Sequence, residues 1–448
     1  MSYEFFLTKV WSYQIESIIL IQRVKALTQS RFVRNVAIVA TGTAGAQAIT
    51  MAFAPIITRL YGPEAFGLLG IFMAILAVLT PMAALTYPIA IVLPKEDAEA
   101  KGLAKLSMML AFGLSVIALA LILTWGDALA QLLGAVSISQ YLWLIPFAML
   151  FAALHQVLEQ WLIRHKQFKL TARVAVLQSL ILNCSKAGAG VWYPLAVVLI
   201  LLQTLTSGLH SFLLWMGLRS AGQHGLNTEH QTCKLRALAH KYRDFPMFRA
   251  PEVTINAASQ GLPVLMLAAF FGPASAGFYT LGRTIMSIPA GLIGKSVGDV
   301  FYPRISEAAN NGEPLYPLVK KATLLLTAVG VVPFGVVMVL GPWLFTFVFG
   351  AEWTMAGEFA RWLAAWMFVG FVNNPSVKAI PILKAQGFQL AFAIVTIILR
   401  TGALAAAYYV YKSDLVAVIA FSLLGAFLNI VLIMIVLHKC KVFDRLRV

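Results

Sequence analysis

The stretch LYGPEAFGL at residues 60–68 returns as FFGPASAGF at residues 270–278, an offset of 210 residues in a chain of 448. A second pair, PKEDAEA at residues 94–100 and PRISEAA at residues 303–309, repeats at nearly the same offset. Each copy is flanked by hydrophobic runs. An internal repeat of this length, close to half of the chain, predicts two similar halves.

The composition places both halves in a membrane. Hydrophobic residues make up 60% of the chain and charged residues 12%, against roughly 25% charged in soluble domains. Apolar runs of about 20 residues recur, long enough to cross a hydrocarbon core about 30 Å thick. These runs lack the period-two alternation of a membrane barrel. The chain is therefore expected to be an all-α polytopic membrane protein, and duplicated proteins of this kind are typically transporters.

Each half contains six apolar spans, so about 12 transmembrane helices in two pseudo-symmetric six-helix lobes are expected. Because six is even, both halves cross in the same direction, which predicts a pseudo-twofold axis along the membrane normal. The spans lie near 36–58, 67–92, 104–125, 141–163, 171–191, 194–217, 253–271, 275–301, 318–340, 357–383, 387–410 and 414–437.

The basic residues predict the orientation of these spans. Most of the 34 lysines and arginines fall at the two ends of the chain and in alternate loops on the same side, whereas the opposite side holds only Arg59, Lys186 and Lys412. By the positive-inside rule, both termini and the central loop are cytoplasmic. These loops also explain the formal charge of +16, so no nucleic-acid partner is predicted.

The boundaries divide the chain into four parts. Residues 1–30 are expected to form a cytoplasmic or interfacial amphipathic segment, with an unstructured leader as the alternative. Residues 31–218 form the first lobe, 219–252 a basic inter-lobe loop attracted to anionic lipid, and 253–448 the second lobe with a short cytoplasmic tail. No loop is long enough for an attached folded domain.

The best candidates for binding are charges placed at membrane depth, where an unpartnered charge costs about 2.5–3.5 kcal/mol. Arg283 shares a helix face with Tyr279 and Ser287, and a cation on a face of small and hydroxylated residues is typical of a cavity wall. The alternative is a structural arginine bonded between helices. Arg400, near the middle of its span, is a second cavity candidate.

The first half has neutral polar residues at corresponding depth. Gln47 shares one face with Thr43 and Thr50, and Asn256 and Gln260 form a comparable stripe in the second half. Such side chains can hydrogen-bond sugar hydroxyls, but they also join membrane helices to each other.

One titratable pair lies within a span. His155 and Glu159 are one turn apart and form a candidate pair for ion coupling, with a structural hydrogen bond as the alternative.

No catalytic, metal or cofactor site is predicted. The three cysteines lack metal-ligand spacing. Residues 289–296 approach the pattern of a phosphate-binding loop, but they begin with Pro289 inside an apolar helix instead of following a strand.

Three motifs carry a family resemblance. The run ITRLYGPEAFG at residues 57–67, LPK at residues 93–95 and RHKQF at residues 164–168 resemble polysaccharide-biosynthesis flippases. These proteins belong to the multidrug/oligosaccharidyl-lipid/polysaccharide exporter superfamily. The similarity covers nearly the whole chain from about residue 30.

The resemblance implies a V-shaped pair of lobes around a cationic cavity in the bacterial inner membrane. It implies alternating access that moves an undecaprenyl-diphosphate-linked oligosaccharide, such as an O-antigen, capsule or exopolysaccharide repeat unit, to the outer leaflet. Arg283 would contact the diphosphate. The partners would be this lipid-linked oligosaccharide, membrane lipid and other polysaccharide assembly proteins.

Three other functions are weighed against this one. A peptidoglycan-precursor flippase is disfavoured because the first span has no arginine except Arg59 at its outer end. A drug or metabolite antiporter is disfavoured because that span has no acidic residue for cation coupling. A membrane glycan polymerase or ligase is disfavoured because the outer loops are short and nearly uncharged, so an enzyme is not expected.

Overall fold

The computed structural model describes residues 31–446 except 133, 135 and 221–234. The segment predicted at residues 1–30 and much of the inter-lobe loop therefore lie outside the described residues. Within them, every long element is a helix and no strand occurs. The long helices are α2 (Arg31–Ala83), α3 (Asp97–Leu132), α4 (Ile145–Arg164), α5 (Phe168–Trp192), α6 (Ala196–Ser220), α8 (Ala250–Phe271), α9 (Pro273–Asn310), α10 (Leu315–Phe349), α11 (Thr354–Val372), α13 (Gln386–Tyr411) and α14 (Asp414–Arg445). The short elements are η1 (Tyr87–Val92), η2 (Val136–Leu144), α7 (Leu235–Lys241), η3 (Phe245–Arg249), η4 (Ala351–Trp353) and α12 (Asn374–Ala379).

The helices account for the twelve expected crossings. Nine of the described helical segments are long and apolar enough to span a bilayer. One of them, α2, bends at Gly62, where φ is 68°, and so supplies two crossings. Two further helices of sufficient length, α9 and α11, carry charged residues such as Arg283 and Arg361. The all-α, twelve-helix fold class predicted from the sequence is confirmed.

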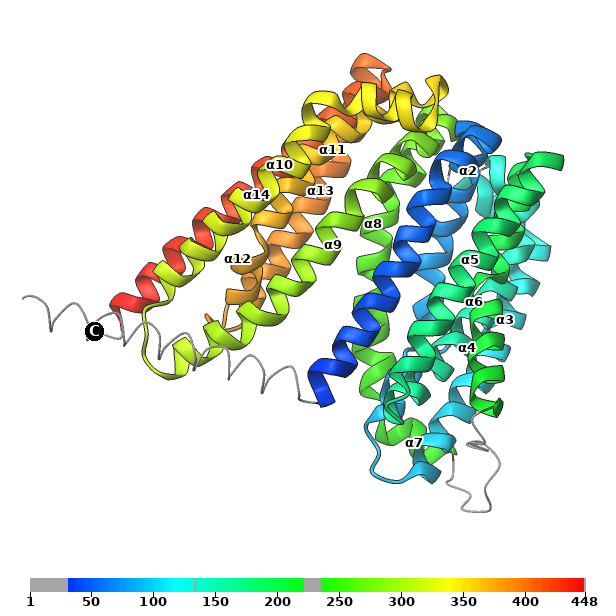
Figure 1. The fold of residues 1–448 in the computed structure, drawn as a ribbon, viewed down its shortest axis with the longest axis horizontal. Helices are drawn as coiled ribbons and strands as arrows, with labels where there is room; N and C mark the ends of the chain where they lie inside the picture. Colours follow the sequence, from blue (N-terminus) through cyan, green and yellow to red (C-terminus); the bar gives the residue numbers. More distant parts are fainter. Residues whose placement is uncertain (1–30, 133, 135, 221–234, 447–448) are drawn as a thin grey trace, which may run out of the picture.

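The crossings form two arms that meet at one end and diverge at the other (Figure 1). Helices α2 to α6 make one arm, the N-lobe, and α9 to α14 make the other, the C-lobe. Helix α8 lies between them and packs against both α2 and α9. The start of α2, helix α7 and the last turn of α14 lie at the diverging end, called here the open end. The bend of α2 and the start of α9 lie at the closed end.

Two predicted spans end early because of proline. The span expected to reach residue 92 ends as an α-helix at Ala83, and the one expected to reach residue 383 breaks after Val372. Pro88 and Pro375 follow these ends; proline lacks an amide hydrogen and its ring collides with the carbonyl four residues before it. Other helices, among them α9 and α14, extend beyond the predicted spans at the open end.

The repeated Gly-Pro segments pack against each other at the closed end. A Cβ atom on Gly67 would overlap the carbonyl oxygen of Pro273, and a Cβ atom on Gly277 would overlap the carbonyl oxygen of Pro63. Pro63 and Pro273 are equivalent in the repeat, as are Gly67 and Gly277. The contact is therefore reciprocal, as a pseudo-twofold axis requires, and only glycine permits this approach of two backbones.

Further contacts join the lobes around this point. The indole Nε1 of the buried Trp353 donates to the carbonyl of Thr58 at 3.1 Å. Arg59 donates to the carbonyls of Phe347 and Val348 at 3.0 and 3.2 Å, at the end of α10. The closed end is thus held by backbone packing and by hydrogen bonds to carbonyl groups.

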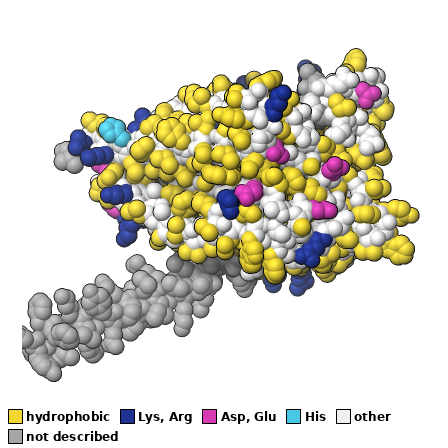
Figure 2. All heavy atoms as spheres, turned by 90° about the horizontal axis from the view of Figure 1, so that it is seen from above, with side chains coloured by type: hydrophobic (Ala, Val, Ile, Leu, Met, Phe, Trp, Pro, Cys, Tyr) yellow, Lys and Arg dark blue, Asp and Glu magenta, His cyan; other side chains and the backbone are white. Residues whose placement is uncertain are grey.

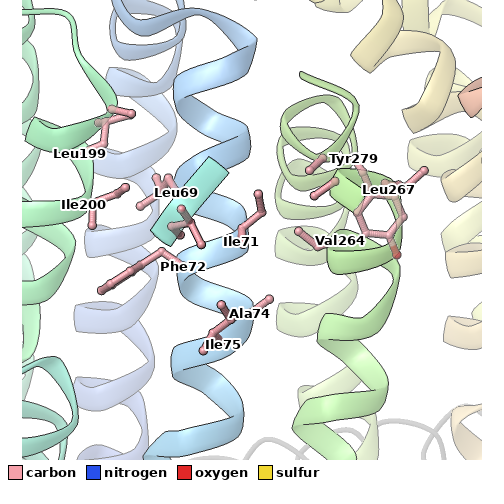
Figure 3. Close-up of a cluster of buried hydrophobic side chains, with 14 of the residues drawn as sticks. Leu69, Ile71, Phe72, Ala74, Ile75, Leu199, Ile200, Val264, Leu267 and Tyr279 are labelled. Carbon is pink, nitrogen blue, oxygen red and sulfur yellow. The ribbon is translucent and has the colours of Figure 1, made fainter. Parts of the chain in front are cut away.

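The hydrophobic core continues from one lobe into the other below this contact. One cluster of buried side chains includes Phe72 on α2, Leu199 on α6, Leu267 on α8 and Tyr279 on α9 (Figure 3). Seen from the closed end, the surface is dominated by hydrophobic side chains, with basic ones gathered at the edge where α14 ends (Figure 2). This distribution is that of a protein whose outer walls contact lipid.

Arg164 joins two loops at the open end of the N-lobe. Arg164 donates to a carboxylate oxygen of Asp97 at 2.8 Å and to the carbonyls of Pro94 and Lys95 at 2.5 and 3.1 Å. Two of the motifs that carry the family resemblance, LPK and RHKQF, are therefore in direct contact.

Candidate functional site

Arg283 lies on α9, ten residues from the closed end, or about 15 Å along the helix. Its guanidinium donates to the backbone carbonyl of Gln260 at 2.6 Å and to the side-chain Oε1 of the same residue at 2.7 Å. Gln260 Nε2 in turn donates to Asn256 Oδ1 at 2.9 Å. The structure thus joins three of the predicted residues in one chain of hydrogen bonds between α8 and α9.

These hydrogen bonds do not neutralise the positive charge of Arg283. Both acceptors on Gln260 are neutral, and no carboxylate forms an ion pair with Arg283 in the described part of the molecule. A guanidinium has five N–H donors, of which the Gln260 contacts use two. Asn256 and Gln260 are exposed and Arg283 is partly so. The arrangement presents a fixed cation with spare donors at an accessible surface.

Arg400, the second predicted cavity residue, packs against two aromatic rings. Its guanidinium carbon lies 3.8 Å from the ring centroid of Trp366 and 3.7 Å from that of Phe421. Its Nε donates to the Phe421 carbonyl at 3.3 Å, and its side chain packs on Gly425. Enclosed by aromatic rings, this arginine contributes positive potential from inside the C-lobe.

The two other predicted residues of α9, Tyr279 and Ser287, differ in their exposure. Tyr279 is 1% exposed, and its hydroxyl has no hydrogen-bond partner among the described residues. This hydroxyl interacts electrostatically with both Arg283 and Arg400. Ser287 is exposed and donates to the carbonyl of Thr284 at 2.8 Å. Tyr279 therefore lies behind the Arg283 surface, and Ser287 lies on the surface.

The N-lobe has a pocket of about 460 Å³ between α2, α5 and α6. Gln47 lines it together with Thr43 and Thr50, the two residues predicted to share its face. The opposite wall was not predicted. It consists of Gln178, Ser179, Asn183, Lys186, Gln203 and Thr206. Their signal was present in α5, where polar residues recur at helical spacing from Gln178 to Lys186.

Lys186 is the clearest miss. It was counted as a charge of the outer side, but it lies inside α5, six residues before the helix ends at Trp192, and it lines the pocket. Its backbone carbonyl accepts a hydrogen bond from the Tyr61 hydroxyl at 2.8 Å.

The predicted pair of His155 and Glu159 adjoins this pocket. The ring of His155 lies 4.4 Å from that of His210, edge to face, and His155 also interacts electrostatically with Glu159. His210 Nδ1 hydrogen-bonds Oε1 of Gln178, which lines the pocket. His210 was not foreseen, because it belongs to a different span, α6. The described residues contain no group of three or more His, Cys, Asp or Glu side chains placed to hold a metal.

Comparison with known proteins adds two findings on sequence. A family model described as polysaccharide biosynthesis protein matches residues 56–358. The succinoglycan biosynthesis transport protein ExoT of Rhizobium meliloti is 26% identical over 410 residues, which cover 85% of this chain and 75% of ExoT.

Two solved structures share the fold. An inward-facing multidrug resistance MATE family transporter of the MOP superfamily is similar with a TM-score of 0.69 at 15% identity, covering 90% of this chain and 99% of its own. Lipid II flippase MurJ in an inward closed conformation has a TM-score of 0.63 at 12% identity, covering 89% and 86%. The V-shaped, two-lobe membrane fold of this superfamily is thereby shown for this chain.

Proposed function

The chain belongs to the polysaccharide biosynthesis protein family, and from this premise we propose that it moves a lipid-linked oligosaccharide across a bilayer. The substrate is an oligosaccharide repeat unit, of an O-antigen, capsule or exopolysaccharide, on an undecaprenyl diphosphate carrier. The similarity to ExoT, a succinoglycan biosynthesis transport protein, favours a polysaccharide unit over a drug or metabolite.

The observation that carries the proposal is the guanidinium of Arg283, which forms no ion pair with any described carboxylate. A diphosphate cannot enter hydrocarbon without partners, because burying an unpaired charge is very costly. Arginine offers two parallel N–H groups to phosphate oxygens, in short charge-assisted bonds. Gln260 orients the guanidinium through its backbone and side-chain oxygens, while the isoprenoid tail stays in the membrane.

The two ends of the molecule support alternating access. The reciprocal Gly-Pro contact closes one end, and the arms diverge at the end that holds α7 and the RHKQF loop. We assign the open end to the cytoplasm of a bacterial inner membrane, because its loops carry most of the basic residues. In this assignment, the substrate enters from the cytoplasmic leaflet and both termini are cytoplasmic.

Replacement of Arg283 tests the headgroup assignment. In a cell that depends on this protein for its surface polysaccharide, Arg283→Ala should lower the amount at least tenfold, with unchanged protein in the membrane. Arg283→Lys should retain part of the activity if charge alone matters, and little if two parallel bonds matter. Arg361→Ala is the matched control, because Arg361 lies in the same lobe and already pairs with Glu358 at 3.3 Å. Normal polysaccharide in Arg283→Ala would refute the assignment.

Cysteine labelling tests the orientation. In a variant whose three native cysteines are replaced by serine, Ser137→Cys at the start of η2 should react with an impermeant thiol reagent from outside intact cells. Lys166→Cys, in the loop after α4, should react only after permeabilisation. The opposite pattern would invert the proposed direction of transport.

A further inference from the structure

The N-lobe pocket holds two kinds of polar side chain, those bonded within the protein and those left free. Ser179 donates to the carbonyl of Ala46 at 2.8 Å, and Asn183 donates to the carbonyl of Ser179 at 2.7 Å and to Thr50 Oγ1 at 3.3 Å. Gln178 donates to the carbonyl of Thr206 at 2.8 Å. These bonds fix the wall between α2, α5 and α6, so the pocket has a defined shape before any ligand enters.

The free set faces the same space. Thr43, Gln47, Gln203 and Lys186 line the pocket, and their side chains make no hydrogen bond or ion pair within the part of the chain that the structure describes. Together they offer two amide groups, one hydroxyl and one ammonium. Amides and hydroxyls both donate and accept, which suits a ligand rich in hydroxyl groups.

Lys186 gives the pocket a positive charge. Among the described residues that line the pocket, it is the single charged one, and none of them is a carboxylate. The residue is about 9 Å from the end of α5 and is half-buried. An ammonium in such surroundings is costly without a counter-charge. The pocket therefore favours an anionic group and disfavours a cation.

We propose that this pocket binds a sugar unit that carries a carboxylate, with Lys186 as its counter-ion. The inference rests on the transport function proposed above and makes an acidic repeat unit the substrate. The volume of about 460 Å³ is within the range of about 300–1,000 Å³ typical of small-molecule sites. Lys186 lies about 9 Å from the end of α5 and Arg283 about 15 Å from the start of α9. In this inference the N-lobe takes the sugar and the C-lobe takes the diphosphate.

Binding of soluble probes to the purified full-length protein tests the division. Isothermal titration calorimetry compares methyl glucuronide, the matched neutral methyl glucoside and inorganic pyrophosphate. Methyl glucuronide should bind about tenfold more tightly than methyl glucoside, the effect of one charge-assisted hydrogen bond. Lys186→Met should abolish this preference and leave pyrophosphate binding unchanged. Arg283→Ala should abolish pyrophosphate binding and leave the preference for glucuronide unchanged.

Two controls separate charge from folding. Lys186→Arg keeps the positive charge and should keep the preference for glucuronide. Lys412→Met makes the same chemical change on an exposed lysine outside the pocket and should alter none of the three affinities. The thermal unfolding midpoint of each variant shows whether it is folded.

The outcomes distinguish this inference from the function on which it rests. If wild-type protein binds pyrophosphate but does not prefer glucuronide, or if the preference survives in Lys186→Met, the acidic-sugar site is refuted and the flippase assignment stands. If Lys186→Met abolishes pyrophosphate binding, Lys186 serves the diphosphate and the inference is likewise overturned. If Arg283→Ala leaves pyrophosphate binding intact, the headgroup assignment fails.

Discussion

The internal duplication is preserved at the closed end of the molecule. It is not preserved at the polar surfaces about two to four helical turns deeper. At the closed end, Pro63 meets Gly277 and Pro273 meets Gly67, so equivalent residues make equivalent contacts. Deeper in the membrane the lobes differ. The position equivalent to Arg283 is Met73, and the N-lobe has instead a pocket of amides and hydroxyls around Lys186.

The difference has a steric cause. At the closed end, backbone lies against backbone and an added Cβ atom has no room, so both copies need glycine. At the deeper surfaces, side chains such as Gln47 and Gln260 are exposed, and a substitution there changes the chemistry of the surface without changing the packing. Duplication therefore supplies a symmetric closure, and under the proposed function the two lobes bind different parts of one substrate.

The largest expected effect comes from breaking the symmetric contact. Gly67→Ala and Gly277→Ala should each prevent closure and lower the amount of surface polysaccharide at least tenfold, because a Cβ at either position overlaps a backbone carbonyl and overpacking costs about 1–3 kcal/mol. In both variants, a cysteine at Thr280, which faces Gly70, should react faster with an impermeant thiol reagent added outside the cell.

The chain offers a matched control for this pair. A Cβ on Gly113 in α3 meets nothing within 4 Å, so Gly113→Ala should behave as wild type. Labelling at the wild-type rate in Gly67→Ala would show that the Gly-Pro contact is not the closure.

The second effect comes from moving the charge across the repeat. The double variant Arg283→Met with Met73→Arg retains the composition and places the arginine at the equivalent site of the N-lobe. It should produce no more polysaccharide than Arg283→Ala, because the two Gln260 oxygens accept from a guanidinium at position 283 on α9. Recovery above half of the wild-type amount would mean that the lobes are interchangeable and that the asymmetry has no functional weight.

The smallest expected effect comes from removing one hydrogen bond at the closed end. Trp353→Phe keeps an aromatic ring beside Phe66, 5.1 Å away, but removes the hydrogen bond to the carbonyl of Thr58. The free energy of unfolding should fall by about 1 kcal/mol, measured by thermal denaturation. Trp343→Phe is the control, since Trp343 is exposed, stacks on Phe347 and has no hydrogen bond from its N–H group to any described residue. Equal losses in both variants would refute a specific role for the Thr58 bond.

Much of the fold was predictable because it depends on local composition. Apolar runs near 20 residues gave the number of helices, and the duplicated Gly-Pro segments gave the two lobes. The helix ends at Ala83 and Val372 were missed, although Pro88 and Pro375 follow them within five residues. The apolar pattern continues past both helix ends. Hydrophobicity alone does not show where a helix stops, because it does not account for the missing amide hydrogen of proline.

The candidate site was predictable only one helix at a time. Helical spacing put Asn256 and Gln260 on one stripe and Arg283 on another, and the structure joined them. Spacing could not show that Arg400 is enclosed by Trp366 and Phe421, because those rings come from α11 and α14. The partner of His155 was missed for the same reason: His210, which itself bonds Gln178, lies on another helix.

The amino-acid sequence by itself determined the class of the protein: a duplicated helical membrane protein with its basic loops on one side and a family signature near its first Gly-Pro turn. These properties follow from the cost of placing polar groups in hydrocarbon, which acts on each segment separately. Only the tertiary structure decided that the two Gly-Pro copies touch, that Arg283 keeps its charge beside Gln260, and that Lys186 belongs to a pocket. Each of these depends on side chains that are far apart in the sequence, and only the packing of one helix against another brings them together.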